Sequence, residues 1–403
     1  MNETKQNFAW PVTSIDQADY EAFSRWFTQA KDYLHGCQLI LWGAGIRGTM
    51  FSILLKERGF HNIKFVDSNP EKHGGFIDEF PILSPEDLEH MREHQEYLVL
   101  ISPENSQGIQ TYLTDKGYQK DTDYFVIESG QYPVYVEEFL RPYDRGTLIM
   151  GDCEFSTMSL NEEDHSTLRE KLYQRLGKGR TKILAMHGIG LRAQYNIFRA
   201  QILAGMKPER LVIMVNFEML TGIQHLLPRS QHAELLRMLR DVQANPTEEF
   251  KEYVRVAEER SQNLQMEFFT SPEETQPVTE AKARNYFRLN YLYNLNVKTE
   301  GLEYLNRFFE LARAESISIL PFIPPVNYEF ARKLFGGTFD ARYGENVKRV
   351  CKIVESAGLR LLDLSYTLSA SLFSTPTTVT ETSNSQGREK VADMLYAAIQ
   401  EMN

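Results

Sequence analysis

The sequence predicts an α/β protein of two domains, each built on a parallel β-sheet. The first observation is length, because 403 residues are too many for one ordinary hydrophobic core. The second is the alternation of short apolar runs with segments of helical period, which is typical of doubly wound parallel sheets. The third is a stretch without sustained period between two such series. We therefore expect domains over residues 1–133 and 134–403.

The first domain is expected to begin with a helix and then to alternate strands and helices. An amphipathic helix is predicted from Ser14 to about His35, with Ser14 and Gln17 placed as a capping box. An apolar strand that starts at Gln38 runs directly into a glycine turn ending at Gly48. Further strands are predicted over residues 63–69, 97–102 and 123–129.

The second domain is expected to follow a linker at residues 130–145, which contain two prolines and no sustained period. Five apolar runs bounded by polar or glycine residues then predict strands that are buried on both faces. These strands are residues 147–152, 182–187, 211–216, 316–322 and 359–364. Between the third and fourth of them, residues 230–314 are charged and have helical period, which predicts a helical insertion. The insertion is expected to be a lid over a site or an oligomerisation arm.

Composition excludes several classes of function. The formal net charge of −11 argues against nucleic-acid binding, which needs a basic surface. No apolar run is long enough for a membrane helix, and the N-terminal residues lack the apolar core of a signal peptide. Three widely spaced cysteines fit a reducing compartment and have no metal-type spacing. We expect a cytoplasmic protein without a metal site, for which a homo-oligomer is possible.

A glycine turn in the first domain is the clearest sign of a ligand. Gly43, Gly45 and Gly48 form G-x-G-x-x-G between a strand and a helix, and Asp67 ends the next strand. Glycines let the backbone approach a phosphate, and the following helix supplies unpaired N–H groups at its N-terminus. Asp67 is placed to accept hydrogen bonds from ribose hydroxyls. The turn predicts a nucleotide-like ligand; the alternative is a tight packing turn without one.

Three segments of this domain, LILWGAGIRG, FVDSNPEKHGG and FPILSPEDL, carry a more particular resemblance. Together they resemble the N-terminal domain of bacterial sugar acetyltransferases and related polysaccharide-biosynthesis proteins. The resemblance implies a Rossmann-like domain, a nucleotide-sugar ligand and a role in surface-glycan metabolism. No other cofactor is implied.

The second domain resembles the SGNH (GDSL-type) hydrolases, which have a flavodoxin-like α/β/α fold. LIMGDCEF places Cys153 where that family has its serine, after the first strand. ILAMHGIGLRAQYN offers Gly188 or Gly190 for the family's oxyanion glycine, and LVIMVNFE places Asn216 near its oxyanion asparagine. ILPFIPPVNYE, LLDLSYTL and SNSQGREKVADML resemble the last two strands and the closing helix.

The sequence departs from this family at the general base. Thr382 stands where the family has its histidine, and a threonine does not act as a base near neutral pH. His187 ends the second strand of the domain and is the first candidate for a substitute; His225, after the third strand, is the second. A Cys153–His187 pair, with Glu154 or Glu218 beside it, would form a thiol nucleophile.

The two resemblances together imply an acyl-ester hydrolase or acyltransferase-like protein that acts on a sugar-linked ester in bacterial surface-polysaccharide metabolism. Cys153 is the expected nucleophile and His187 the expected base. The backbone N–H of Cys153, Gly190 and Asn216 are the expected oxyanion donors. The alternative is an inactive pseudo-hydrolase that binds a nucleotide-sugar or glycan as a scaffold or regulator, with Cys153 and His187 as structural residues. A third hypothesis is a nicotinamide- or methyl-donor-dependent enzyme that uses the first domain alone.

Overall fold

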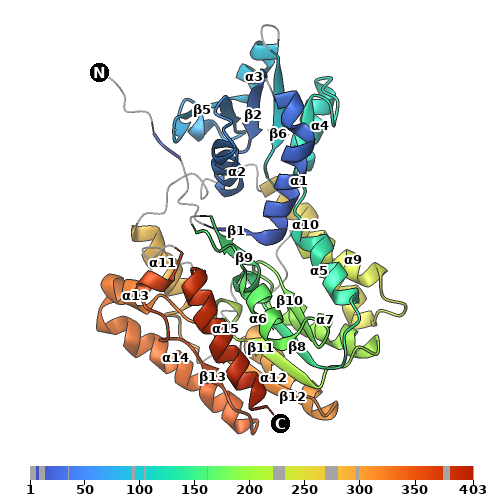
Figure 1. Ribbon diagram of the computed structural model, residues 1–403, viewed down its shortest axis with the longest axis vertical. Helices are drawn as coiled ribbons and strands as arrows, with labels where there is room; N and C mark the ends of the chain where they lie inside the picture. The colour runs from blue at the N-terminus through green and yellow to red at the C-terminus, as the bar shows by residue number, and fades with distance from the viewer. Residues whose placement is uncertain are drawn as a thin grey trace. The chain divides into compact units, whose positions relative to one another are not determined.

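The computed structural model divides the chain into two compact units (Figure 1). Their main parts are Met1–Gly130 and, for the second, Gln131–Ser261 with Glu280–Asn403. The structure describes residues 6–8, 14–34, 36–92, 96–103, 106–160, 162–220, 232–267, 280–295, 299–374 and 382–402. Both units are α/β with mainly parallel sheets, so the expected α/β class is confirmed. Among the described residues, no helix is long and apolar enough to cross a membrane.

The first unit is a sheet with strand order β4-β5-β3-β2-β6-β7, in which only the β4–β5 pair is antiparallel. Its central strand, β2 (Gln38–Trp42), is buried along its whole length and alternates its side chains between the two faces. Ile40 and Trp42 join one core cluster of this unit. The other strands are β3 (Ile63–Val66), β4 (Phe76–Ile77), β5 (Phe80–Leu83), β6 (Tyr97–Ile101) and β7 (Tyr124–Val126). The helices are α1 (Gln17–Leu34), α2 (Ile46–Glu57), α3 (Pro85–Arg92) and α4 (Gln107–Asp115).

The capping box predicted at Ser14 is wrong. Ser14–Asp16 has strand conformation (β1), and α1 begins three residues later, at Gln17. Asp16 makes the cap instead, since its Oδ1 accepts a hydrogen bond from the Ala18 N–H at 2.9 Å. The residue that starts the helix is therefore an aspartate that the sequence pattern did not single out.

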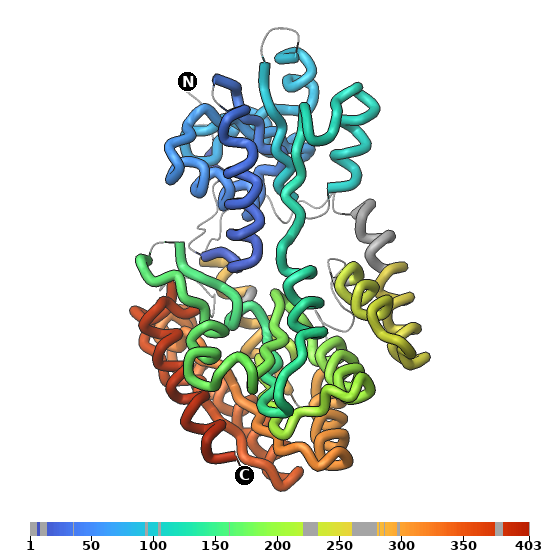
Figure 2. Tube along the Cα trace, turned by 45° about the vertical axis from the view of Figure 1, so that its right-hand side comes forward, coloured from blue at the N-terminus to red at the C-terminus, as the bar shows by residue number. Residues whose placement is uncertain are grey.

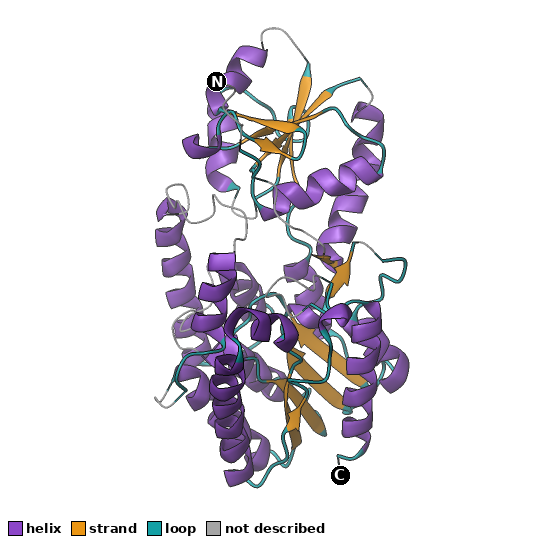
Figure 3. Cartoon of the chain, turned by 90° about the vertical axis from the view of Figure 1, so that its left-hand side faces the viewer, coloured by secondary structure: helices purple, strands orange, loops and turns teal. Residues whose placement is uncertain are grey.

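The second unit is a parallel sheet with strand order β10-β8-β11-β12-β13. Helices lie on both sides of its strands in Figure 3. The strands are β8 (Thr147–Gly151), β10 (Thr181–Ala185), β11 (Arg210–Met214), β12 (Ser318–Ile323) and β13 (Leu362–Asp363), with the short β9 (Thr157–Ser159) outside this sheet. The main crossover and closing helices are α6 (Leu168–Leu176), α7 (Leu191–Leu203), α12 (Glu300–Ala314), α13 (Tyr328–Phe335), α14 (Gly337–Ser356) and α15 (Ser385–Gln400). Because the direction of winding reverses after β10, right-handed crossovers place α6 and α7 on opposite faces. Accordingly, α15 packs against α6, and α12 packs against α7.

The linker predicted at residues 130–145 is also wrong. Gln131–Leu140 forms a helix, α5, which follows β7 along the trace in Figure 2. Tyr132, Tyr135, Val136 and Phe139 recur at helical spacing and are buried in the core of the second unit. Pro133 does not prevent this helix, because it lies in the first turn, where its missing N–H has no partner to lose.

The expected insertion between β11 and β12 is helical. Its described helices after α8 (Phe217–Leu220) are α9 (His232–Asp241), α10 (Glu248–Glu267), α11 (Glu280–Asn290) and α12. His225, the second candidate base, lies outside the described residues.

Candidate functional site

The carboxyl edge of the second sheet is the place where the predicted site residues gather. In a parallel sheet of this strand order, ligands bind where neighbouring crossovers leave in opposite directions, which here is between β8 and β11. The segments that leave β8, β10 and β11 carry Cys153, His187 and Asn216, respectively. The sequence-predicted residues of this unit therefore share one edge of one sheet.

Strand register places these three residues at a common level. Gly151 pairs with Ala185, and Cys153 and His187 each come two residues later. Met150 pairs with Ile213, and Cys153 and Asn216 each come three residues later. The Cys153 side chain is half-buried, His187 is exposed and Asn216 is only 2% exposed. Their order across the edge follows the order of the strands, with Cys153 in the middle.

Asp152 organises this edge, and sequence reasoning gave it no role. It caps the short 3₁₀ helix Cys153–Phe155, because its Oδ1 accepts from the Glu154 N–H at 3.1 Å. Its Oδ2 accepts from the Asn216 amide at 3.0 Å, and the Asn216 Oδ1 in turn accepts from the Glu218 N–H at 3.1 Å. The loops after β8 and β11 are thus joined through buried side chains. An aspartate directly after a buried strand and before a helical turn is the signal that could have found it.

The Cys153 backbone is held in the same way. Its carbonyl accepts hydrogen bonds from the Thr157 hydroxyl at 2.6 Å and the Ser156 N–H at 3.0 Å. Gly190 is the N-cap of α7 and is buried, so the first turn of that helix begins at this edge. Thr382 is 9% exposed, and its carbonyl accepts from the Ser374 N–H at 2.9 Å.

Two buried carboxyl groups flank Cys153. Burial raises the pKa of Asp152, and the hydrogen bond from Asn216 offsets part of that rise. Burial raises the pKa of Glu154 well above its usual value, and the Asp152 carboxylate raises it further against the opposing charge of Arg388. Glu154 therefore keeps its proton to a higher pH than an exposed glutamate does.

Glu154→Gln is expected to gain stability relative to the wild type as pH rises from 5 to 8. The folded protein binds a proton at Glu154 that the unfolded chain releases above the ordinary glutamate pKa of 4.5. Wild-type stability therefore falls over this window, whereas glutamine does not titrate. Urea denaturation at both pH values measures the difference. Glu345→Gln, on the surface, is the control. Its free energy of unfolding should stay within about 0.5 kcal/mol of the wild-type value at both pH values. If the difference in unfolding free energy between Glu154→Gln and the wild type does not change with pH, the pKa of Glu154 is not raised in the folded protein.

The glycine turn of the first unit has the geometry of a close packing turn with one open position. Gly43 has φ +110°, a conformation that side chains rarely adopt. A Cβ at Gly48 would lie 1.9 Å from the Gly43 carbonyl oxygen, so only glycine fits there. At Gly45, the N-cap of α2, an added Cβ meets nothing within 4 Å. Gly43 and Gly48 thus serve the fold, and Gly45 is the position that borders open space.

Asp67 binds the glycine turn directly. Its Oδ2 accepts from the Ala44 N–H at 2.7 Å and pairs with the Lys72 ammonium at 3.1 Å, and its Oδ1 accepts from the Asn69 N–H at 2.9 Å. Lys72 is 5% exposed and also donates to the Ala44 carbonyl at 3.1 Å. Asp67 and Lys72 therefore hold the backbone of the turn at Ala44. A ribose hydroxyl at Asp67 would have to share carboxylate oxygens that already accept hydrogen bonds from the protein. Sequence reasoning missed Lys72, although it lies within the FVDSNPEKHGG segment.

Gly48→Ala is expected to destabilise the first unit by about 3 kcal/mol, because its methyl group overlaps a backbone oxygen that cannot move alone. Gly45→Ala is the matched control, with an expected cost below about 1 kcal/mol. All three tryptophans lie within the first 42 residues, so tryptophan fluorescence in urea reports on this unit. Equal midpoints for the two variants would show that the turn is not packed as described.

Among the described residues, no group of three or more histidine, cysteine, aspartate or glutamate side chains is arranged to hold a metal ion. In comparisons with known proteins, no protein-family model matches this sequence, and no curated protein matches it.

Proposed function

We propose that the second unit is an acyl-ester hydrolase or acyltransferase of the SGNH type, acting on a sugar-linked ester in bacterial surface-polysaccharide metabolism. One observation carries the proposal: Cys153, His187 and Asn216 follow neighbouring parallel strands at matched register, on either side of the point where winding reverses. The strand order of this unit is that of flavodoxin-like sheets, which agrees with the resemblance of its sequence to SGNH hydrolases.

Cys153 is the nucleophile in this proposal. His187 takes the proton of the thiol, and the sulfur attacks the carbonyl carbon of the ester. The tetrahedral intermediate then collapses, the C–O bond breaks, and the imidazolium returns the proton to the departing alcohol. The product is an acyl thioester on Cys153. Water releases the acyl group in a hydrolase, and a sugar hydroxyl accepts it in a transferase.

The oxyanion is held by the Asn216 amide and the backbone N–H groups of Cys153 and Gly190. Asp152 acts through these donors as a positioning residue: it orients the Asn216 amide at 3.0 Å and caps the turn that holds the Cys153 backbone. Donors fixed before the reaction stabilise the developing charge without reorganisation, which is the main source of rate in such sites.

The first unit, in the same proposal, is a Rossmann-like domain that binds a nucleotide or nucleotide-sugar. Two observations support this assignment. The parallel strands run in the order β5-β3-β2-β6-β7, which puts the glycine turn after β2 at the point where winding reverses. Gly45, at the start of α2, borders open space, so a phosphate can approach the backbone there.

The alternative function is a non-catalytic scaffold or regulator that binds a nucleotide-sugar or glycan. Two observations favour it: the family's histidine is replaced by the buried Thr382, and the Asn216 amide already donates to Asp152. In this version Cys153 and Asn216 stabilise the sheet edge and carry out no chemistry.

Incubation of the full chain with p-nitrophenyl acetate separates the two functions. The enzyme hypothesis predicts release of p-nitrophenol and an acetyl thioester that peptide mass spectrometry locates on Cys153 and hydroxylamine removes. The scaffold hypothesis predicts no acetyl group at Cys153 and release at the rate of the buffer alone.

A further inference from the structure

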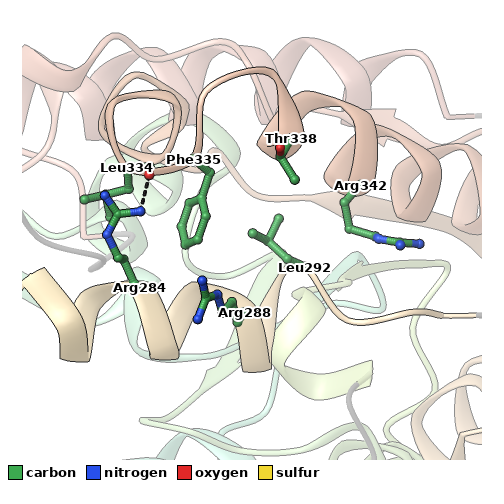
Figure 4. Close-up of a pocket in the computed structure, with 7 residues that line it drawn as sticks. All are labelled: Arg284, Arg288, Leu292, Leu334, Phe335, Thr338 and Arg342. Atoms are coloured by element: carbon green, nitrogen blue, oxygen red, sulfur yellow. Dashed lines mark hydrogen bonds between the residues drawn. The ribbon is translucent and has the colours of Figure 1, made fainter.

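A cavity of the second unit lies between α11, α13 and the start of α14, and none of Cys153, His187 and Asn216 lines it (Figure 4). Its volume is about 400 Å³. Three of its lining side chains are arginines, in a chain whose net charge is −11. The lining residues are Arg284, Arg288, Leu292, Leu334, Phe335, Thr338 and Arg342.

Arg288 carries a charge that no described residue neutralises. Arg284 is paired with Glu280 at 2.7 Å and donates to the Leu334 carbonyl, and Arg342 is paired with Glu345 at 3.1 Å. Arg288 is exposed and makes no hydrogen bond or ion pair with any residue in the described part of the chain. In Figure 4 the Arg284 and Arg288 side chains rise from α11 toward Phe335. An anion that enters the cavity therefore meets a guanidinium whose N–H donors are occupied by no described residue.

Phe335 gives the same cavity an apolar wall. Its ring lies 5.5 Å from the Arg284 guanidinium carbon and 5.9 Å from that of Arg288. The Phe335 ring packs against the fully buried ring of Phe287, with 6.0 Å between the two ring centroids. Leu292 extends the apolar surface, and Thr338 lines the cavity from α14. Such a site suits a ligand with an anionic end and an apolar or ring-shaped body.

We propose that this cavity binds an organic phosphate monoester, with the phosphate at Arg288 and Arg284 and the organic group against Phe335 and Leu292. A phosphate dianion matches two adjacent guanidinium groups better than a carboxylate does, because it carries the greater charge and more acceptor oxygens. The proposal stands on this cavity alone and does not depend on the chemistry at Cys153.

Isothermal titration of the full chain with phenyl phosphate tests the proposal. Phenyl phosphate is expected to bind more tightly than inorganic phosphate, which lacks the ring, and phenol is expected not to bind. Arg288→Ala should weaken phenyl phosphate binding about 10-fold, the loss of one charge-assisted contact, and Arg288→Lys should weaken it less. Arg255→Ala is the matched control, since Arg255 is an exposed arginine of α10 that does not line the cavity. Its affinity should equal that of the wild type.

Five results would overturn the proposal. An absence of phenyl phosphate binding to the wild type would reject the site. Binding to Arg288→Ala as tight as to the wild type would put the ligand elsewhere, including the glycine turn of the first unit. Equal weakening by Arg255→Ala would reduce the effect to overall charge. Benzoate or inorganic phosphate binding as tightly as phenyl phosphate would reject an organic phosphate as the ligand. Circular dichroism of each variant verifies that it is folded.

Discussion

Cys153→Ala is expected to lower the rate of p-nitrophenyl acetate turnover at least about 10³-fold, to the rate of the buffer. The reason is that alanine cannot form the acyl intermediate, and the neighbouring groups supply no second nucleophile in the proposed mechanism. His187→Ala should lower the rate by a comparable factor, because the thiol and its base act as a unit. Stopped assays at several substrate concentrations give kcat and KM, and the loss is expected in kcat.

Cys351→Ala is the matched control for this experiment. Cys351 lies on α14 and is half-buried, and its hydrogen bond to Glu355 at 3.2 Å raises the pKa of its thiol. It is therefore a poor nucleophile, and its removal should leave turnover unchanged. If Cys153→Ala instead turns over as fast as the wild type, the acyl-transfer mechanism is wrong and the scaffold function is preferred.

The sheets could be predicted from the sequence because parallel strands buried on both faces are continuous apolar runs. LILW and TLIM each give one strand whose residues are buried on both faces, and no packing detail is needed to find them. The helix α5 was missed because Pro133 and Pro142 suggested a linker. The spacing of Tyr132, Tyr135 and Phe139 carried the correct signal, and a proline in the first turn does not oppose it.

The candidate site could be predicted only as far as topology determines it. The resemblance to SGNH hydrolases singled out Cys153 and Asn216. Residues that directly follow parallel strands must share one edge, so the predicted strands alone placed these two residues at the same edge of the sheet. The bond between Asp152 and Asn216 joins residues 64 positions apart and depends on side-chain packing, which a single sequence does not encode locally. The same holds for the cavity at Arg288, whose walls come from α11, α13 and α14.

Arg388 is the residue of the second unit whose loss is expected to cost the most stability. Its side chain is fully buried, at 0% exposure, at the start of α15. Nε donates to the Ser166 carbonyl at 2.8 Å and Nη1 to the Ser383 carbonyl at 2.7 Å, while Nη2 donates to the Asp164 carbonyl at 3.2 Å and pairs with Glu162 at 3.4 Å. One guanidinium thus joins the segment after β9 to the segment that leads into α15.

Arg388→Met should therefore destabilise the second unit by about 3–5 kcal/mol, because three carbonyl groups and Glu162 lose a buried charged donor at once. Arg388→Lys should lose less stability than Arg388→Met, because lysine keeps the positive charge. It should still be less stable than the wild type, because one ammonium group cannot reach all the acceptors. Arg360→Met is the control: Arg360 is 65% exposed and pairs with Glu401, so its cost should stay below about 1 kcal/mol. Urea denaturation followed by circular dichroism gives the midpoints. Equal midpoints for Arg388→Met and Arg360→Met would mean that the buried network contributes no stability, and hydrogen exchange of residues 162–166 would then match the wild type.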